Sequence, residues 1–167
     1  DDDGSGTVAV LEIAQAFATA KAEGHGPRRS MLFMTVSGEE EGLLGSEWYS
    51  EHPVFPLDST EADLNIDMIG RVDTTHRDSG PYVYVIGSGR LSSELKAINE
   101  RENAEWTKLD LDYTFDSDSD PNRFYYRSDH YNFAKHGVPI AFFFNGVHED
   151  YHRPSDEVDK IRFALLH

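Results

Sequence analysis

Three adjacent acidic residues, Glu39, Glu40 and Glu41, are the strongest sign of chemistry in the sequence. They follow residues 30–36, which are nearly all apolar, the pattern of a strand buried on both faces. In open α/β sheets, ligands bind just beyond the carboxyl ends of strands. Three carboxylates in such a place repel one another unless a cation is present. The alternative is an acidic first turn of a helix, which the helix dipole favours.

Three further residues could join this acidic group. Asp67 lies in a second apolar stretch, residues 62–68, where a buried carboxylate is costly unless it is paired or bound to a metal. His152 lies in an acidic loop after the apolar residues 138–144, and Asp2 precedes the first expected helix. Taken singly, they could be a solvent-facing strand end, a surface histidine and a helix cap. Taken together, they supply carboxylate and imidazole ligands of the kind that suits zinc.

Composition narrows the class of protein. The 167 residues are about one domain long, and 38% of them are hydrophobic, enough for a sizeable core. The net charge of −16 disfavours binding to a nucleic-acid backbone. No apolar run reaches the ~18–20 residues of a membrane span. The chain has no cysteine, so any metal site must use His, Asp and Glu.

Hydrophobic periodicity predicts alternating helices and strands. Helices are expected at residues 4–21, 41–51, 91–103 and 129–136, and strands at residues 30–36, 62–68, 82–86 and 138–144. Residues 110–126 are expected to form a loop, and a last helix is expected to begin at residue 156. Strands that alternate with helices favour an α/β layer fold with a mostly parallel sheet.

Five ordered motifs resemble those of the secreted bacterial di-zinc aminopeptidases. Glutamate carboxypeptidases, glutaminyl cyclases and the transferrin receptor ectodomain share the fold of that family. The motifs are DDGSG at 2–6, SGEEEGLLGS at 37–46, DMIG at 67–70, RSDH at 127–130 and YH at 151–152. The resemblance implies a zinc-exopeptidase fold of the phosphorylase/hydrolase-like type, with a mixed, mostly parallel central sheet flanked by helices on both faces.

The resemblance also assigns roles to residues. Glu39 is expected to be the general base, and Tyr151 is a candidate to steady the tetrahedral intermediate. Independently of the resemblance, Asp129 is expected either near the pocket, as an acid behind the site, or as a helix cap. A cis peptide is expected between Asp2 and Asp3. The implied zinc ligands are Asp2, which bridges two ions, Glu40 and His152, which complete one site, and Asp67, which binds the second ion.

The resemblance further implies that residues 1–167 are one zinc-peptidase catalytic domain that is incomplete at both ends. Family members take another zinc ligand, a histidine, from upstream of the bridging aspartate. We therefore expect two zinc ions in the full-length enzyme and one well-formed site within these residues. A secreted or periplasmic location is expected from the family alone.

The expected function is metal-dependent hydrolysis of N-terminal amino acids from peptides with a free N-terminus. One alternative is a glutaminyl-cyclase-like acyl transfer at a single zinc, held by Asp, Glu and His. Another is a catalytically inactive fragment or binding domain of the same fold.

A second acidic pattern does not predict a calcium-binding EF-hand. Asp116, Asp118 and Asp120 alternate as such a loop begins, but Pro121 replaces the required glycine and Arg127 replaces the bidentate glutamate. A surface calcium site at these aspartates stays open.

Overall fold

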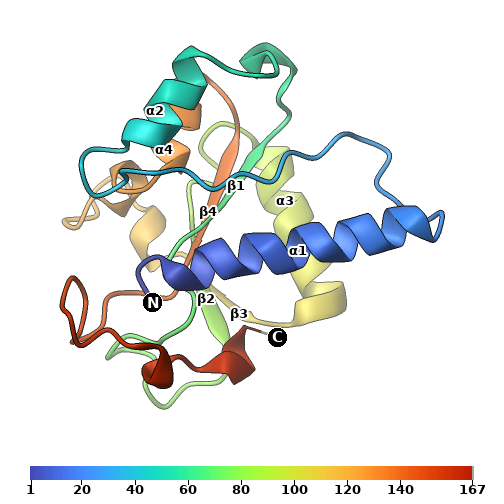
Figure 1. The fold of residues 1–167 in the computed structure, drawn as a ribbon. Coiled ribbons are helices and arrows are strands. Elements are labelled where there is room, and N and C mark those ends of the chain that lie inside the picture. The colour runs from blue at the N-terminus through green and yellow to red at the C-terminus, as the bar shows by residue number, and fades with distance from the viewer. Residues whose placement is uncertain (167) are drawn as a thin grey trace.

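The computed structural model describes residues 1–166, and its centre is a four-stranded sheet (Figure 1). The strands are β1 (Asp63–Ile66), β2 (Tyr82–Ile86), β3 (Asp110–Asp112) and β4 (Ile140–Phe144), in the order β1-β4-β2-β3. The β1–β4 and β2–β3 pairs are parallel and the β2–β4 pair is antiparallel. The expected mixed, mostly parallel sheet is therefore confirmed.

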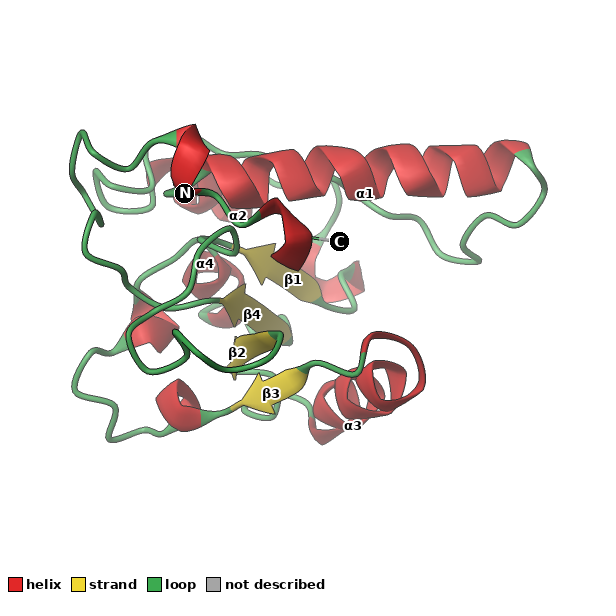
Figure 2. Cartoon of the chain, turned by 90° about the horizontal axis from the view of Figure 1, so that it is seen from below, coloured by secondary structure: helices red, strands yellow, loops and turns green. Residues whose placement is uncertain are grey.

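Helices pack along the sheet, with α2 and α4 to one side of the strands and α1 and α3 to the other (Figure 1). The α-helices are α1 (Gly4–Ala22), α2 (Leu44–Glu51), α3 (Ser93–Glu102) and α4 (His130–Ala134). The chain begins beside the end of β1, and α1 runs outward from there (Figure 2). Asp3 caps α1 because its carboxylate accepts a hydrogen bond from the amide of Gly6 at 3.0 Å. Within residues 1–166 no helix is both long and apolar enough to cross a membrane.

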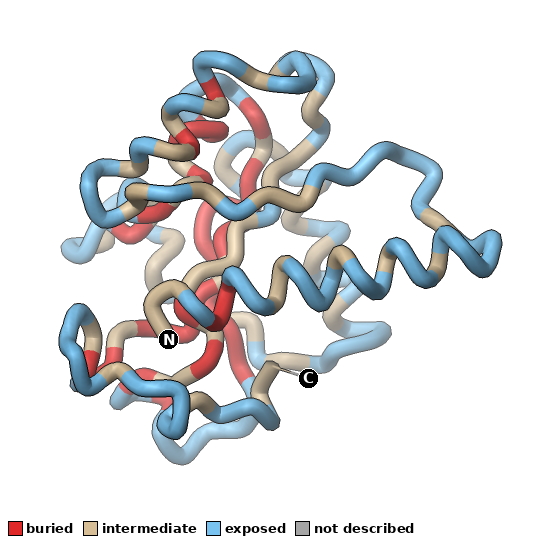
Figure 3. Tube along the Cα trace, in the orientation of Figure 1, coloured by how far each residue is buried: buried red, intermediate tan, exposed pale blue. Residues whose placement is uncertain are grey.

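The core follows β2 and β4, the two central strands (Figure 3). Every residue of β2 is buried, as is typical of a strand that is covered on both faces. One apolar cluster joins Tyr84, Phe142 and Phe144 to Met68 and Phe124. These last two residues also line the candidate site, so the site rests directly on the core.

The prediction of a buried strand at residues 30–36 is wrong. No backbone pairing joins this segment to the sheet, and Met31 and Leu32 are 44% and 51% exposed. Phe33 instead contacts Phe17 of α1, with ring centroids 5.8 Å apart. A strand needs a neighbour for its backbone groups, and within residues 1–166 β1 pairs with β4 alone.

Other boundaries also differ from expectation. The expected loop at 110–126 contains the edge strand β3, because Leu111 pairs with Val83 of β2. The helix expected from residue 41 begins at Leu44, because Gly42 and Leu43 have positive φ angles of 107° and 62°. After residue 156 the structure has only single 3₁₀ turns, at Val158–Lys160 and Phe163–Leu165, and residue 167 lies outside the described residues.

Candidate active site

Asp2, Glu40 and His152 come together although they are far apart in the sequence. The Nε2 atom of His152 lies 3.2 Å from Oδ2 of Asp2 and 3.1 Å from Oε2 of Glu40. One potential ligand atom from each residue lies within 4.8 Å of the other two. Two carboxylates and one imidazole form a donor set that suits zinc, which in catalytic sites typically has three protein ligands.

A tight turn presents the acidic triplet. Gly38 has a φ of +74°, which side chains rarely adopt. The carbonyl of Glu39 accepts hydrogen bonds from the amides of Gly42 and Leu43, at 3.0 and 2.8 Å. Gly45 lets the chain close on itself, because a Cβ there would lie 2.6 Å from the carbonyl oxygen of Ser37. The backbone of the turn therefore fixes where the acidic side chains stand.

A network of buried polar groups holds Asp2 and the loop around residue 152 together. The backbone nitrogens of Asp1 and Asp2 both donate to Oδ2 of Asp156, at 2.8 and 3.2 Å. Arg71 donates to Asp156 at 3.2 Å and to Asp150 at 2.8 Å, so it ties both sides of that loop to the segment after β1. These hydrogen bonds bring the first residues of the chain beside residues 150–156.

The side chain of Asp1 is buried and has two roles in this network. Its Oδ1 accepts from the hydroxyl of Ser5 at 2.7 Å and from the amide of Gly70 at 2.9 Å. Its Oδ2 lies 3.2 Å from Nε2 of His148, at a charge-pairing distance but without hydrogen-bond geometry. Asp1, Arg71, His148 and Asp156 were not predicted as site residues from the sequence. The acids that surround His148 were the only available signal.

The backbone is unusual beside two of the predicted ligands. The Asp2–Asp3 peptide is cis, as the resemblance implies. Met68, next to Asp67, has a φ of 53°, and His152 has a φ of 57°. Left-handed conformations of non-glycine residues cluster at functional sites. The left-handed conformations of Met68 and His152 fit a functional role for this part of the chain.

Asp67 lies in the same cavity but outside the three-residue group. Its Oδ2 accepts a hydrogen bond from Ser128 at 2.8 Å. Its Oδ1 is buried and has no hydrogen-bond partner among residues 1–166. An unpartnered buried carboxylate oxygen is costly, and a cation is the partner that would satisfy it. Asp67 therefore fits the role of a ligand for a second ion.

The cavity between these residues is small, about 30 Å³, and strongly acidic. Burial, followed by the charge of Glu40, raises the pKa of Glu39 to about 7 and that of Asp2 to about 6. Burial, followed by the charge of Asp3, raises the pKa of Asp67 to about 8. These carboxylates hold their protons unusually tightly, because burial and mutual repulsion outweigh the opposing charges of His152 and Arg127. A metal cation supplies the balancing charge.

Glu39, Tyr151 and Asp129 occupy different places around this cavity. Glu39 and Tyr151 line it, and Tyr151 stacks on His152 with ring centroids 3.8 Å apart. Asp129 does not line it. Asp129 accepts a short hydrogen bond from Ser46 and makes no capping hydrogen bond to α4. Of the two expected positions, the one behind the site fits the structure, because the charge of Asp129 also raises the pKa of Glu39.

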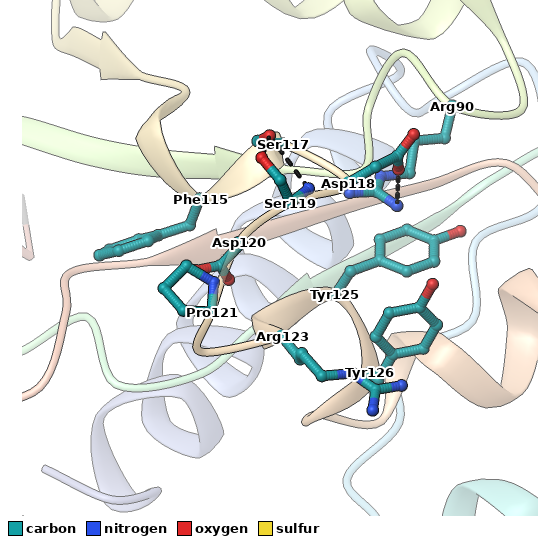
Figure 4. Close-up of a pocket in the computed structure, with 10 residues that line it drawn as sticks. All are labelled: Arg90, Phe115, Ser117, Asp118, Ser119, Asp120, Pro121, Arg123, Tyr125 and Tyr126. Carbon is teal, nitrogen blue, oxygen red and sulfur yellow. Dashed lines mark hydrogen bonds and ion pairs between the residues drawn. The ribbon is translucent and has the colours of Figure 1, made fainter.

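A larger cavity, of about 370 Å³, lies over the loop at 115–126 (Figure 4). Asp118 pairs there with Arg90 at 2.8 Å, and Arg90 also lies 3.5 Å from Asp116 and 3.9 Å from the ring centroid of Tyr125. Two of the three acids that resemble the start of an EF-hand, Asp116 and Asp118, are thus paired with an arginine, which does not favour a calcium loop.

Comparison with known proteins defines the class to which this fold and site belong. The model of peptidase family M28 matches residues 1–167. The chain belongs to this family.

Some proteins resemble this chain in sequence, and others resemble it in fold. The chain is 30% identical over 172 residues to a probable leucine aminopeptidase of Arthroderma benhamiae, a match that covers 99% of this chain and 43% of the relative. It therefore spans less than half the length of that protein. An aminopeptidase from Aneurinibacillus sp. strain AM-1 has the same fold, with a TM-score of 0.68 and 23% identity over 99% of this chain and 35% of that one. A glutaminyl cyclase of Porphyromonas gingivalis has a TM-score of 0.62 and 21% identity, over 99% of this chain and 60% of that one.

Proposed function

We propose that the protein is a zinc aminopeptidase that removes N-terminal amino acids from peptides. Its membership of peptidase family M28 and its similarity to a probable leucine aminopeptidase support this reaction class. The observation that carries the proposal is the convergence of Asp2, Glu40 and His152 on one point, with Glu39 in the same cavity but outside the group.

Glu39 and Glu40 are adjacent in the sequence, but we assign them different roles in the reaction. Glu40 contacts His152 within the ligand group, and as a zinc ligand its carboxylate would not be free to accept a proton. Glu39 stands beside it, makes no such contact within the described chain, and lines the cavity. A carboxylate in this position can accept a proton from an attacking water and later donate it.

The reaction then follows from where Glu39 and Tyr151 stand. The water oxygen attacks the scissile carbonyl carbon while its proton passes to Glu39. Glu39 then returns that proton to the amide nitrogen as the carbon–nitrogen bond breaks. Tyr151 would donate a hydrogen bond to the carbonyl oxygen, on which negative charge develops. Bound zinc, held by Asp2, Glu40 and His152, with Asp67 toward a second ion, would act as a Lewis acid and lower the pKa of the water.

The role of Glu39 can be tested in the full-length protein with aminoacyl-nitroanilide substrates. Glu39→Gln keeps the shape of the side chain but cannot accept a proton. Loss of a general base lowers kcat by about 10²- to 10⁴-fold, and zinc content should stay at the wild-type level. Glu41→Gln is the matched control, because Glu41 is an exposed neighbour outside the cavity. Wild-type turnover by the Glu39→Gln protein would end the assignment.

A glutaminyl-cyclase-like acyl transfer is the second candidate function. Two observations favour it: the fold resembles that of a glutaminyl cyclase, and the converging group is a single site with Asp, Glu and His. The number of zinc ions in the full-length protein separates the candidates. Two ions per chain favour the aminopeptidase, and a single ion together with cyclisation of an N-terminal glutamine would favour the cyclase.

A further inference from the structure

Arg127 lies at the edge of the candidate active site, and its side chain has no role in the mechanism above. It is exposed, and it is the only Lys or Arg among the residues that line the catalytic cavity. Its Nη2 donates a hydrogen bond to the hydroxyl of Tyr151 at 3.2 Å. Its guanidinium carbon lies 4.9 Å from the ring centroid of Phe124, a core residue that is only 7% exposed. The position of the guanidinium group is thus fixed from two sides.

This guanidinium group keeps most of its hydrogen-bonding capacity. A guanidinium has five N–H donors, and the hydrogen bond to Tyr151 is the only side-chain bond that Arg127 makes within residues 1–166. Carboxylates line the same cavity, yet Arg127 forms no ion pair with any carboxylate of the described chain. The charge of Arg127 acts on Glu39 only from a distance, without an ion pair or a hydrogen bond. The free donors are therefore available to a group from outside the protein.

The location of Arg127 indicates which part of a peptide that group belongs to. A cation repels the free amine of the substrate, so the amine lies toward the acids and the leaving residue lies toward Arg127. The Nη2 atom of Arg127 lies 3.2 Å from the hydroxyl of Tyr151. If that hydroxyl contacts the scissile carbonyl oxygen, Arg127 lies next to the scissile bond. Consecutive residues of a peptide are spaced by about 3.8 Å. The carboxylate of a dipeptide, one residue beyond the scissile bond, is within reach.

We propose that Arg127 determines substrate specificity by binding the free carboxylate of the leaving residue, so that dipeptides are the preferred substrate class. This inference rests on the proposed aminopeptidase function. The planar guanidinium can make two parallel hydrogen bonds to a carboxylate, whereas lysine provides only a point charge. A role limited to positioning Tyr151 would instead affect every peptide substrate alike.

The test compares leucylglycine with leucylglycinamide, which differ only in the terminal carboxylate. The zinc-loaded full-length protein should have a higher kcat/KM for the acid than for the amide. Hydrogen bonds to charged groups correspond to a preference of about 10- to 100-fold. Arg127→Gln should lose that preference, and Arg127→Lys should keep part of it.

Arg123→Gln is the matched control and should keep the wild-type preference. Its guanidinium also lies 4.9 Å from an aromatic ring, that of Tyr126, but Arg123 lines the larger cavity (Figure 4). An equal acid-to-amide ratio in the wild-type and Arg127→Gln proteins would overturn the role of Arg127, while hydrolysis itself would still support the aminopeptidase. Failure of the wild-type protein to cleave either peptide would contradict the proposed function as well.

Discussion

Replacing Asp63 with asparagine should stabilise the protein at neutral and higher pH. Asp63 opens β1, and its Oδ2 atom is buried without a hydrogen-bond partner in the described chain. Burial, with a smaller effect from the charge of Asp129, raises the pKa of Asp63 from 3.8 to about 7. One unit of pKa corresponds to about 1.4 kcal/mol. Ionising this carboxylate therefore costs the folded state up to about 4 kcal/mol above pH 7.

The sign of the pH dependence follows from the raised pKa. Between pH 3.8 and about 7 the folded state binds this proton more tightly than the unfolded chain. The contribution of Asp63 to stability is therefore full at low pH and falls as the pH rises through that window. Asp63→Asn removes the charge and keeps the shape, so its advantage over wild type should be about 2 to 3 kcal/mol larger at pH 8 than at pH 5.

Urea unfolding at pH 5 and pH 8 measures this difference directly. The two proteins should also have equal m-values if only the native charge has changed. Asp58→Asn is a control at an exposed position, and its effect should be small at both pH values. A free-energy difference between Asp63→Asn and wild type that is the same at pH 5 and pH 8 would show that the charge of Asp63 does not destabilise the folded state.

Two other buried groups allow similar predictions. Ser46→Ala removes a fully buried hydroxyl that donates to Asp129 and accepts a hydrogen bond from Asn132 at 2.7 Å, so thermal or urea unfolding should show a loss of about 1 to 3 kcal/mol. Ser50→Ala, which loses only a hydrogen bond to a helix carbonyl, should cost less. Burial lowers the pKa of His130 from 6.5 to about 3, so the folded state binds this proton less readily than the unfolded chain does. The free energy of unfolding should therefore decrease as the pH drops below 6.5. Between pH 7 and pH 5 the wild-type protein should lose about 2 kcal/mol more stability than the His130→Asn protein. Equal losses in the two proteins would contradict the neutral state of His130.

The sequence was informative about the site because its chemistry is carried by short motifs. Glu39, Glu40, Asp67 and His152 each stand in a local pattern of apolar and polar residues that marks the end of a segment. The structure brings Asp2, Glu40 and His152 together and places Glu39 and Asp67 in the same cavity. Their roles as ligands and base stay predictions.

The site residues that were not predicted from the sequence are positioned by contacts between distant segments. Nothing local links Asp1 to His148, or Arg71 to Asp156, because these pairs form only when the ends of β1 and β4 lie side by side. The apolar segment at 30–36 shows the opposite error. Its composition predicts a strand, but a strand also needs a neighbour to pair with, and local composition does not reveal whether one is present.

Zinc titration by calorimetry shows whether Asp2, Glu40 and His152 form a metal site. The wild-type protein should bind zinc at this site. Glu40→Gln should weaken that binding by at least about tenfold, because losing a ligand should cost no less than losing a supporting residue, which typically costs about 10- to 100-fold. Glu41→Gln, next to it but exposed, should bind zinc like the wild type. Equal zinc stoichiometry and affinity in the Glu40→Gln and wild-type proteins would show that Glu40 is not a zinc ligand.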